Sequence, residues 1–109
     1  MASFWSRLRG LLGGGSSAEA YLQRGMEKAN RKDSAGAIHE YTYVIDMPHA
    51  PEELRAMALY NRALVYAADS NPAIARRDLE LVATMETAPE RVRNSAREKL
   101  KRIDRRGAK

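Results

Sequence analysis

The side chains best suited to acid–base or metal chemistry in this chain are two histidines and a pair of neighbouring carboxylates. His39 and His49 lack the His-x3-His or HExxH spacing that places two imidazoles around one metal ion. Glu52 and Glu53 are adjacent, so on a helix they point to different sides and cannot flank one substrate atom. They are better explained as first-turn acids, because carboxylates favour the positive end of a helix dipole. We therefore predict a non-enzymatic protein with no catalytic residue, no metal site and no cofactor.

Composition narrows the class of protein further. The 109 residues include no cysteine, which excludes disulfides and Cys-based nucleophiles or metal sites. The sequence has no GxxxxGK[ST] loop and no window of about 18 uninterrupted apolar residues, so it predicts neither a phosphate-binding loop nor a transmembrane helix. Its length allows one small domain. We expect a cytoplasmic protein that is peripherally membrane-associated if its N-terminal segment binds lipid.

Positive charge is concentrated at the C-terminal end. The net charge is +5, and residues 89–109 hold nine of the 19 Lys and Arg but only three of the 14 acids. Such a run is most often a solvated helix face, but it can also bind phosphates. Nucleic-acid or ribosome binding is therefore the alternative function, although this segment has no aromatic residue for stacking on bases. The residues of this basic patch are Arg91, Arg97, Lys99, Lys101, Arg102, Arg105 and Arg106.

Residues 1–12 have the pattern of a short amphipathic helix. Their large apolar side chains recur with the spacing of one helix face. Residues 13–17 are Gly and Ser only, which predicts a flexible linker. The segment could dock on a membrane surface, dock into a larger protein complex, or have no role, and the sequence leaves these three readings open. The docking residues would be Phe4, Trp5, Leu8, Leu11 and Leu12.

Capping residues, prolines and apolar periodicity predict five further helices in a domain at residues 18–104, followed by a basic tail at 105–109. The first helix should begin near Ala18, after a Ser16-x-x-Glu19 capping box. The second should start at Asp33 or Ser34 and end before Pro48. The third should run from Pro51 to about position 68, and the last two should begin at residues 71–72 and 87–90.

The body of the chain repeats with a shift of 38 residues. A period of roughly 20 to 50 residues is typical of stacked repeats that bury their apolar faces against one another. The most closely matched segment is Val44, Met47, Ala50, Pro51, Glu52 and Arg55, which recurs as Val82, Met85, Ala88, Pro89, Glu90 and Arg93. The sequence therefore predicts a repeat protein, a class that mostly binds other molecules.

Each period contains small and large residues at characteristic positions. They are Tyr21, Gly25, Ala37, Tyr41 and Val44 in the first unit, and Leu59, Ala63, Tyr66, Ala75, Leu79 and Val82 in the second. Over residues 18–88 this order resembles the tetratricopeptide repeat family, whose units are two antiparallel helices. Lys32 and Ser70 stand where that family usually has glycine, and the 38-residue spacing exceeds its usual 34, which requires a longer link between Ile45 and Pro51.

The resemblance implies an all-α fold: a short right-handed solenoid of two helix-turn-helix hairpins plus a C-terminal capping helix. It also implies a concave groove, lined by the first helix of each pair, that binds a peptide or an amphipathic helix of a partner. We predict an interaction module, such as an adaptor, assembly factor or small accessory subunit of a larger complex. Apolar residues at this spacing also occur in cores, so both readings stay open for Tyr60 and Leu64. The groove residues would be Leu22, Met26, Asn30, Met57, Tyr60, Asn61 and Leu64.

Overall fold

The computed structural model describes residues 17–107, and this part of the chain is all-helical. The expected all-α class is therefore confirmed for these residues. The amphipathic segment at residues 1–12, its linker through Ser16, and the last two residues of the tail lie outside the described residues. The helices are α2 (Ser17–Asn30), α3 (Ser34–Asp46), α4 (Glu52–Ala68), α5 (Pro72–Thr84) and α6 (Glu90–Gly107).

The helix boundaries follow the capping signals, with two corrections at the ends of the domain. The Asp33 side chain caps α3 by accepting a hydrogen bond from the Gly36 amide at 3.0 Å, whereas Asn71 precedes α5 without a side-chain cap. Ser17, predicted to be linker, is the first residue of α2. Residues 105–107, predicted to be tail, form the last turn of α6, because no helix breaker interrupts that helix before Gly107.

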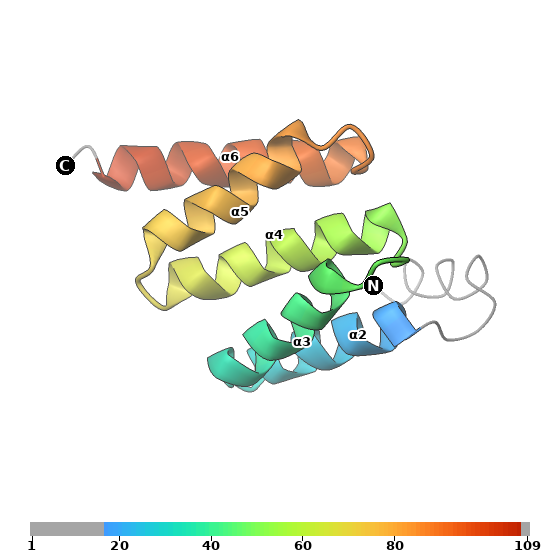
Figure 1. The fold of residues 1–109 in the computed structure, drawn as a ribbon. Coiled ribbons are helices and arrows are strands. Elements are labelled where there is room, and N and C mark those ends of the chain that lie inside the picture. The colour runs from blue at the N-terminus through green and yellow to red at the C-terminus, as the bar shows by residue number, and fades with distance from the viewer. Residues whose placement is uncertain (1–16, 108–109) are drawn as a thin grey trace.

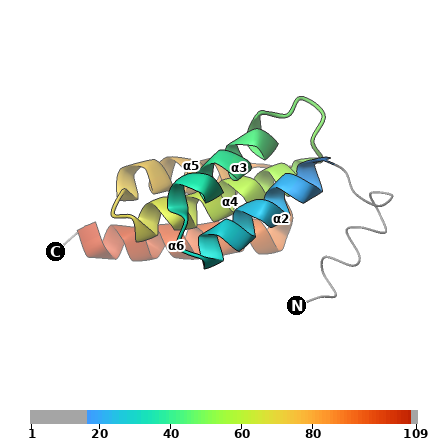
Figure 2. The ribbon, with the colours of Figure 1, turned by 90° about the horizontal axis from the view of Figure 1, so that it is seen from below.

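Helix α4 occupies the middle of the molecule. In Figure 1, α5 and α6 lie above α4, and α2 and α3 lie below it. Helix α4 packs on each of the other four described helices. Figure 2 shows the same arrangement from below, with α3 and α5 on one side and α2 and α6 on the other. The hairpins α2–α3 and α4–α5 are thus stacked, with α6 added at one end, while a right-handed solenoid stays a prediction.

The link before α4 and the link before α6 are held by two equivalent arginines. In the first link, the Arg55 guanidinium donates hydrogen bonds to the carbonyls of Ile45, Met47 and Ala50, the last two at 2.9 and 3.5 Å. In the second, the Arg93 guanidinium donates to the carbonyls of Met85 and Glu86 at 3.3 and 3.2 Å. The most closely repeated sequence therefore encodes a loop whose backbone is tied to the next helix.

Each hairpin is also joined by a buried acid and an arginine at equivalent positions. Arg62 of α4 donates two hydrogen bonds to the Asp78 carboxylate of α5, at 2.8 and 2.9 Å. In the first hairpin, Glu40 of α3 pairs with Arg24 at 3.6 Å and with Lys28 at 2.7 Å. Glu40 and Asp78 are buried, with exposed fractions of 6% and 4%. Buried charges need such partners, so each pair satisfies an acid that would otherwise be costly between the two helices of its hairpin.

The turns within the two hairpins have the same backbone conformation. Lys32 and Ser70 have φ angles of 67° and 65°, in the left-handed region that favours glycine. The next amide in each turn, from Asp33 or Asn71, donates to the carbonyl five residues earlier at 2.8 Å. This is the hydrogen bond of a Schellman helix terminus. Lys32 and Ser70, which stand where tetratricopeptide repeats usually have glycine, thus adopt the left-handed conformation although neither is a glycine.

Gly25 is required by the close approach of α2 and α3. A Cβ atom at this position would lie 2.5 and 2.7 Å from two ring carbons of Tyr41. The Tyr41 ring is 2% exposed and belongs to the core, so it has little room to move. The other predicted small positions, Ala37, Ala63 and Ala75, have no exposed surface. The predicted close approach of paired helices is thus confirmed at Gly25, and the three alanines are confirmed as core positions.

Gly25→Ala should destabilise the fold by about 1–3 kcal/mol through overpacking against Tyr41. In a helix with free space at this position, the same change would stabilise the fold by about 1 kcal/mol, because alanine favours helix more than glycine does. The sign of the effect therefore shows whether Tyr41 crowds this position. The free energy of unfolding from urea denaturation measures the effect. Gly107→Ala is the matched control, because a Cβ there would meet nothing within 4 Å. Unchanged or increased stability of Gly25→Ala would contradict the close approach of α2 and α3.

Glu40 should make folding stability depend on pH in the acidic range. The hydrogen bond from Lys28 lowers the pKa of Glu40 below its ordinary value of 4.5, outweighing the opposite effect of burial. An acid with a lowered folded pKa stabilises the fold above its unfolded pKa, and this contribution is lost as the pH falls through the folded value.

The difference in unfolding free energy between the native chain and Glu40→Gln should therefore stay constant from neutral pH down to about pH 5 and shrink below the ordinary glutamate pKa. Urea denaturation followed by circular dichroism at several pH values measures it. Glu80→Gln, an exposed position on α5, is the control and should leave the pH profile of stability nearly unchanged. A Glu40→Gln difference that does not shrink on acidification would contradict the role of the Lys28 pair.

Candidate functional site

Four of the predicted groove residues line one cavity between α2 and α4. Its volume is about 510 Å³. Met26 and Asn30 reach it from α2, and Asn61 and Leu64 reach it from α4. Tyr41 of α3 contributes to its lining as well. The structure therefore brings together side chains that are more than 30 residues apart in sequence.

The remaining α4 residues of the predicted groove lie toward α6. Met57, Tyr60 and Asn61 line a smaller hollow of about 210 Å³ together with Val92 and Ser95 of α6. Asn61 thus borders the hollows on both sides of α4. The predicted groove continues along α4 with α2 on one side and α6 on the other, and we call this surface the α4 groove.

Leu22 does not belong to the α4 groove, which corrects its prediction. Its side chain has no exposed surface and packs in the core cluster with Tyr41, Val44 and Leu54. Helical spacing identifies the apolar stripe of α2 that contains Leu22. It does not show which residues of that stripe are covered by neighbouring helices. A partner could not reach this side chain without opening the core.

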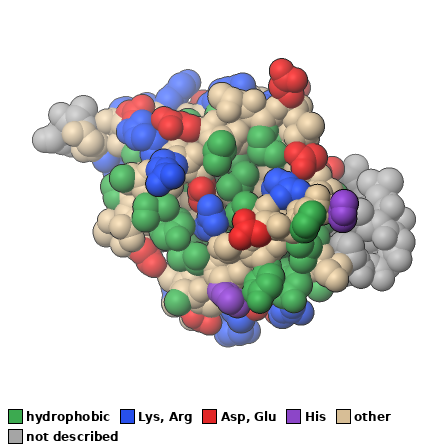
Figure 3. Space-filling model, in the orientation of Figure 1, with side chains coloured by type: hydrophobic (Ala, Val, Ile, Leu, Met, Phe, Trp, Pro, Cys, Tyr) green, Lys and Arg blue, Asp and Glu red, His purple; other side chains and the backbone are tan. Residues whose placement is uncertain are grey.

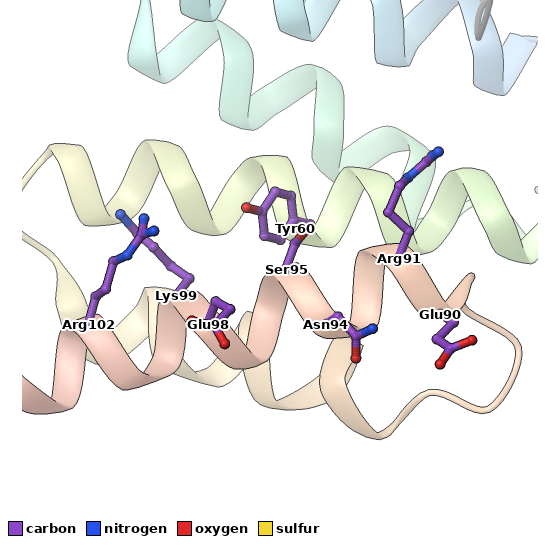
Figure 4. Close-up of a pocket in the computed structure, with 8 residues that line it drawn as sticks. All are labelled: Tyr60, Glu90, Arg91, Asn94, Ser95, Glu98, Lys99 and Arg102. Carbon is purple, nitrogen blue, oxygen red and sulfur yellow. The ribbon is translucent and has the colours of Figure 1, made fainter.

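Part of the basic patch borders the α4 groove. A hollow of about 660 Å³ lies between Tyr60 of α4 and the outer side of α6. Figure 4 shows Lys99 and Arg102 extending toward α4 on one side of Tyr60, and Arg91 extending toward α4 on the other. Two features that the sequence presented as separate, the groove and the basic patch, are therefore adjacent.

The other basic residues of the patch point elsewhere. Arg97 donates to the Ala83 carbonyl at 3.1 Å and to the Asn94 side chain at 2.9 Å, which ties it to the end of α5. Lys101 pairs with Glu98 at 3.6 Å. Arg106 shares a further hollow with Lys99 and Arg102, and Arg105 is exposed in the last turn. Arg97 and Lys101 are thus engaged outside the cations beside Tyr60, whereas Arg106 adjoins them.

The contribution of α6 to the groove could have been found from the repeat itself. Moving the groove positions Met26 and Asn30 forward by 38 residues gives Leu64 and Ala68, and a second shift gives Arg102 and Arg106. The same shift moves the groove residue Asn61 onto Lys99. Lys99 and Arg102 border the hollow beside Tyr60. The predicted groove included only the first two units, because the fifth helix was expected to cap the repeat.

The two halves of the α4 groove differ in charge. The half between α2 and α4 is mostly apolar or amide in character, with Lys32 and Asp69 as its charged residues. Burial raises the pKa of Tyr41 to about 12, so its phenol is neutral at physiological pH. The half between α4 and α6 is bordered by three cations, Arg91, Lys99 and Arg102, and by two acids, Glu90 and Glu98. The α6 end of the groove is therefore the more highly charged one, with a surplus of cations.

The side chains considered for acid–base chemistry lie outside the α4 groove. His39 contacts the edge of the Tyr43 ring, with 5.0 Å between ring centroids, and Tyr43 stacks on Tyr21 at 4.9 Å. Glu52 pairs with Arg55 at 3.0 Å.

Figure 3 shows hydrophobic side chains interspersed with charged ones on the face toward the viewer in Figure 1. Within residues 17–107, no group of three or more His, Cys, Asp or Glu is placed to hold a metal ion.

Comparison with known proteins gives no family assignment. No family model, no curated protein and no solved structure matches the chain. The resemblance to tetratricopeptide repeats therefore stays a prediction that rests on the residues. None of the helices between Ser17 and Gly107 combines the length and the apolar character that crossing a membrane requires.

Leu22→Ala and Leu64→Ala should differ in their effect on stability, because Leu22 lies in the core and Leu64 lies at the groove. Leu22→Ala should lower the unfolding free energy by about 2–5 kcal/mol, because it leaves a cavity in the core. Leu64 is half-buried at the groove, so Leu64→Ala should cost about 1 kcal/mol or less. Chemical denaturation of both variants measures the difference. Equal losses would mean that Leu64 is as much a core residue as Leu22.

Proposed function

We propose that this protein is a non-enzymatic interaction module of the tetratricopeptide type, which holds a segment of a partner protein in the α4 groove. It would act as an adaptor, an assembly factor or a small accessory subunit of a larger complex. The observation that carries this proposal is that groove positions chosen by their place in the repeat line adjoining hollows along one helix. Six of the seven predicted residues take part: Met26, Asn30, Met57, Tyr60, Asn61 and Leu64.

The chemistry of the groove suits a protein segment. Met26, Met57 and Leu64 provide apolar surface, and the two thioethers can adapt to different side chains. Tyr60 and Asn61 add hydrogen-bonding groups beside that surface. An apolar strip with a few polar groups and a charged border is the usual make-up of a peptide-binding surface.

Residues 1–12 supply a second docking element in this proposal. The apolar face of Phe4, Trp5 and Leu8 would place the module at a membrane surface or within a larger complex. That role rests on the sequence alone, and the groove function does not depend on it.

Site-specific photo-crosslinking in the cells that produce the protein tests the groove function. A benzoylphenylalanine at Asn61, which borders two hollows of the groove, should give a discrete crosslinked protein. The same probe at Leu81, which is 55% exposed on α5, should not give it, because that side chain borders none of the groove hollows. Adding Tyr60→Ala and Leu64→Ala should reduce the Asn61 crosslink several-fold, since these changes remove contact area from the groove.

Two controls give that result its meaning. Circular dichroism should show that each variant keeps its helical content, so that a lost crosslink reports lost binding. Removing residues 1–12 from the Asn61 probe variant should leave binding in the groove intact if a partner is delivered in solution. The groove function is wrong if Asn61 and Leu81 give the same crosslinked species, or if Asn61 gives none.

A further inference from the structure

We infer that the partner segment held in the α4 groove is an acidic amphipathic helix, with its apolar face on α4 and its carboxylates toward α6. This inference rests on the proposed function and names the chemistry of its partner. It follows from charge complementarity, because the α6 border of the groove presents cations while the floor along α4 is apolar.

The orientation of charged side chains on α6 carries the argument. Figure 4 shows Arg91, Lys99 and Arg102 reaching from α6 toward α4. Of the acids that line the same hollow, Glu90 points away from α4 in Figure 4, and Glu98 pairs with Lys101 at 3.6 Å. Three cations and two acids thus line the hollow, and the cations are the side chains that reach toward α4.

The apolar floor beside these cations fixes the second property of the partner. Met57 and Val92 lie next to Tyr60 in the adjoining hollow, and Met26 and Leu64 continue the apolar surface toward α2. Adjacent helix axes are about 10 Å apart, so a segment crossing from α2 to α6 spans roughly 20 Å. That length corresponds to roughly 13 residues of α-helix. A helix of this length can present apolar side chains to α4 and carboxylates to α6.

Two other occupants fit the groove less well. The chain's own N-terminal segment carries Arg7 and Arg9, so the cations of α6 would repel it. A nucleic acid would use cations spread along one surface and aromatic residues for stacking. Arg97, Lys101 and Arg105 are turned away from the hollow beside Tyr60, which contains one aromatic residue.

Three synthetic peptides test the inference. Each is an 18-residue, fluorescein-labelled amphipathic helix with the same Leu and Met face, and the polar face carries Glu, Gln or Lys. Fluorescence anisotropy with the full-length protein measures the dissociation constants. The Glu peptide should bind at least 5-fold more tightly than the Gln peptide and the Lys peptide most weakly, because exposed ion pairs contribute modestly but add up. Raising the salt concentration should reduce this preference.

Charge reversal on α6 identifies the residues responsible. Lys99→Glu with Arg102→Glu should weaken the Glu peptide at least 10-fold and strengthen the Lys peptide. Arg77→Glu with Arg105→Glu makes the same change in net charge at exposed positions of α5 and α6 that border none of the groove hollows, and should alter either affinity less than 3-fold. This matched pair separates a local contact from the effect of overall charge.

The possible results distinguish the inference from the proposed function. Equal binding of the Glu and Gln peptides, with loss of both in Tyr60→Ala plus Leu64→Ala, overturns the acidic partner but leaves the groove function standing. No binding of any peptide at millimolar concentration also overturns the acidic partner. The groove function is then tested by photo-crosslinking at Asn61. Tighter binding of a 12-nucleotide oligouridylate or of phosphatidylglycerol vesicles, independent of Tyr60 and Leu64, overturns it in favour of a phosphate-binding surface.

Discussion

The placement of α4 depends on the guanidinium of Arg55. A link of five residues between α3 and α4 leaves backbone carbonyls that no helix satisfies, and unpaired buried carbonyls are costly. Arg55, in the first turn of α4, donates hydrogen bonds to two carbonyls of this link and to one in the last turn of α3. Because α4 packs on all four other described helices, the angle at which it leaves this link sets both core clusters and the groove. Arg93 repeats the arrangement before α6.

Local signals in the sequence were sufficient to predict the helices. Asp33, Pro51 and Pro72 act within one turn of their own helix start, so their effect needs no knowledge of the fold. The close approach at Gly25 was also predictable, because small residues recur where paired helices meet. The buried pairs, such as Arg62 with Asp78, were missed because charged residues are usually solvated, and only the fold shows that both lie between helices.

The groove was predicted less completely, for a physical reason. Periodicity identifies an apolar face, but neighbouring helices determine which part of that face is covered. Leu22 and Met26 are four residues apart on α2, yet Leu22 has no exposed surface and Met26 borders a cavity. The direction of Lys99 and Arg102 likewise depends on how α6 packs against α4. Such properties follow from contacts between helices, which a single-helix pattern does not contain.

The two kinds of position in the repeat explain how one scaffold can carry a specialised surface. Several positions that hold the helices together keep the same kind of residue after a shift of 38, as the arginines Arg55 and Arg93 do and as the acids Glu40 and Asp78 do. Groove positions change at each step, and one series runs from Met26 through Leu64 to Arg102. Because the links and buried pairs fix the backbone, groove residues can differ without altering the fold. In the proposed function, this change from apolar to cationic residues would orient a partner that carries charge at one end.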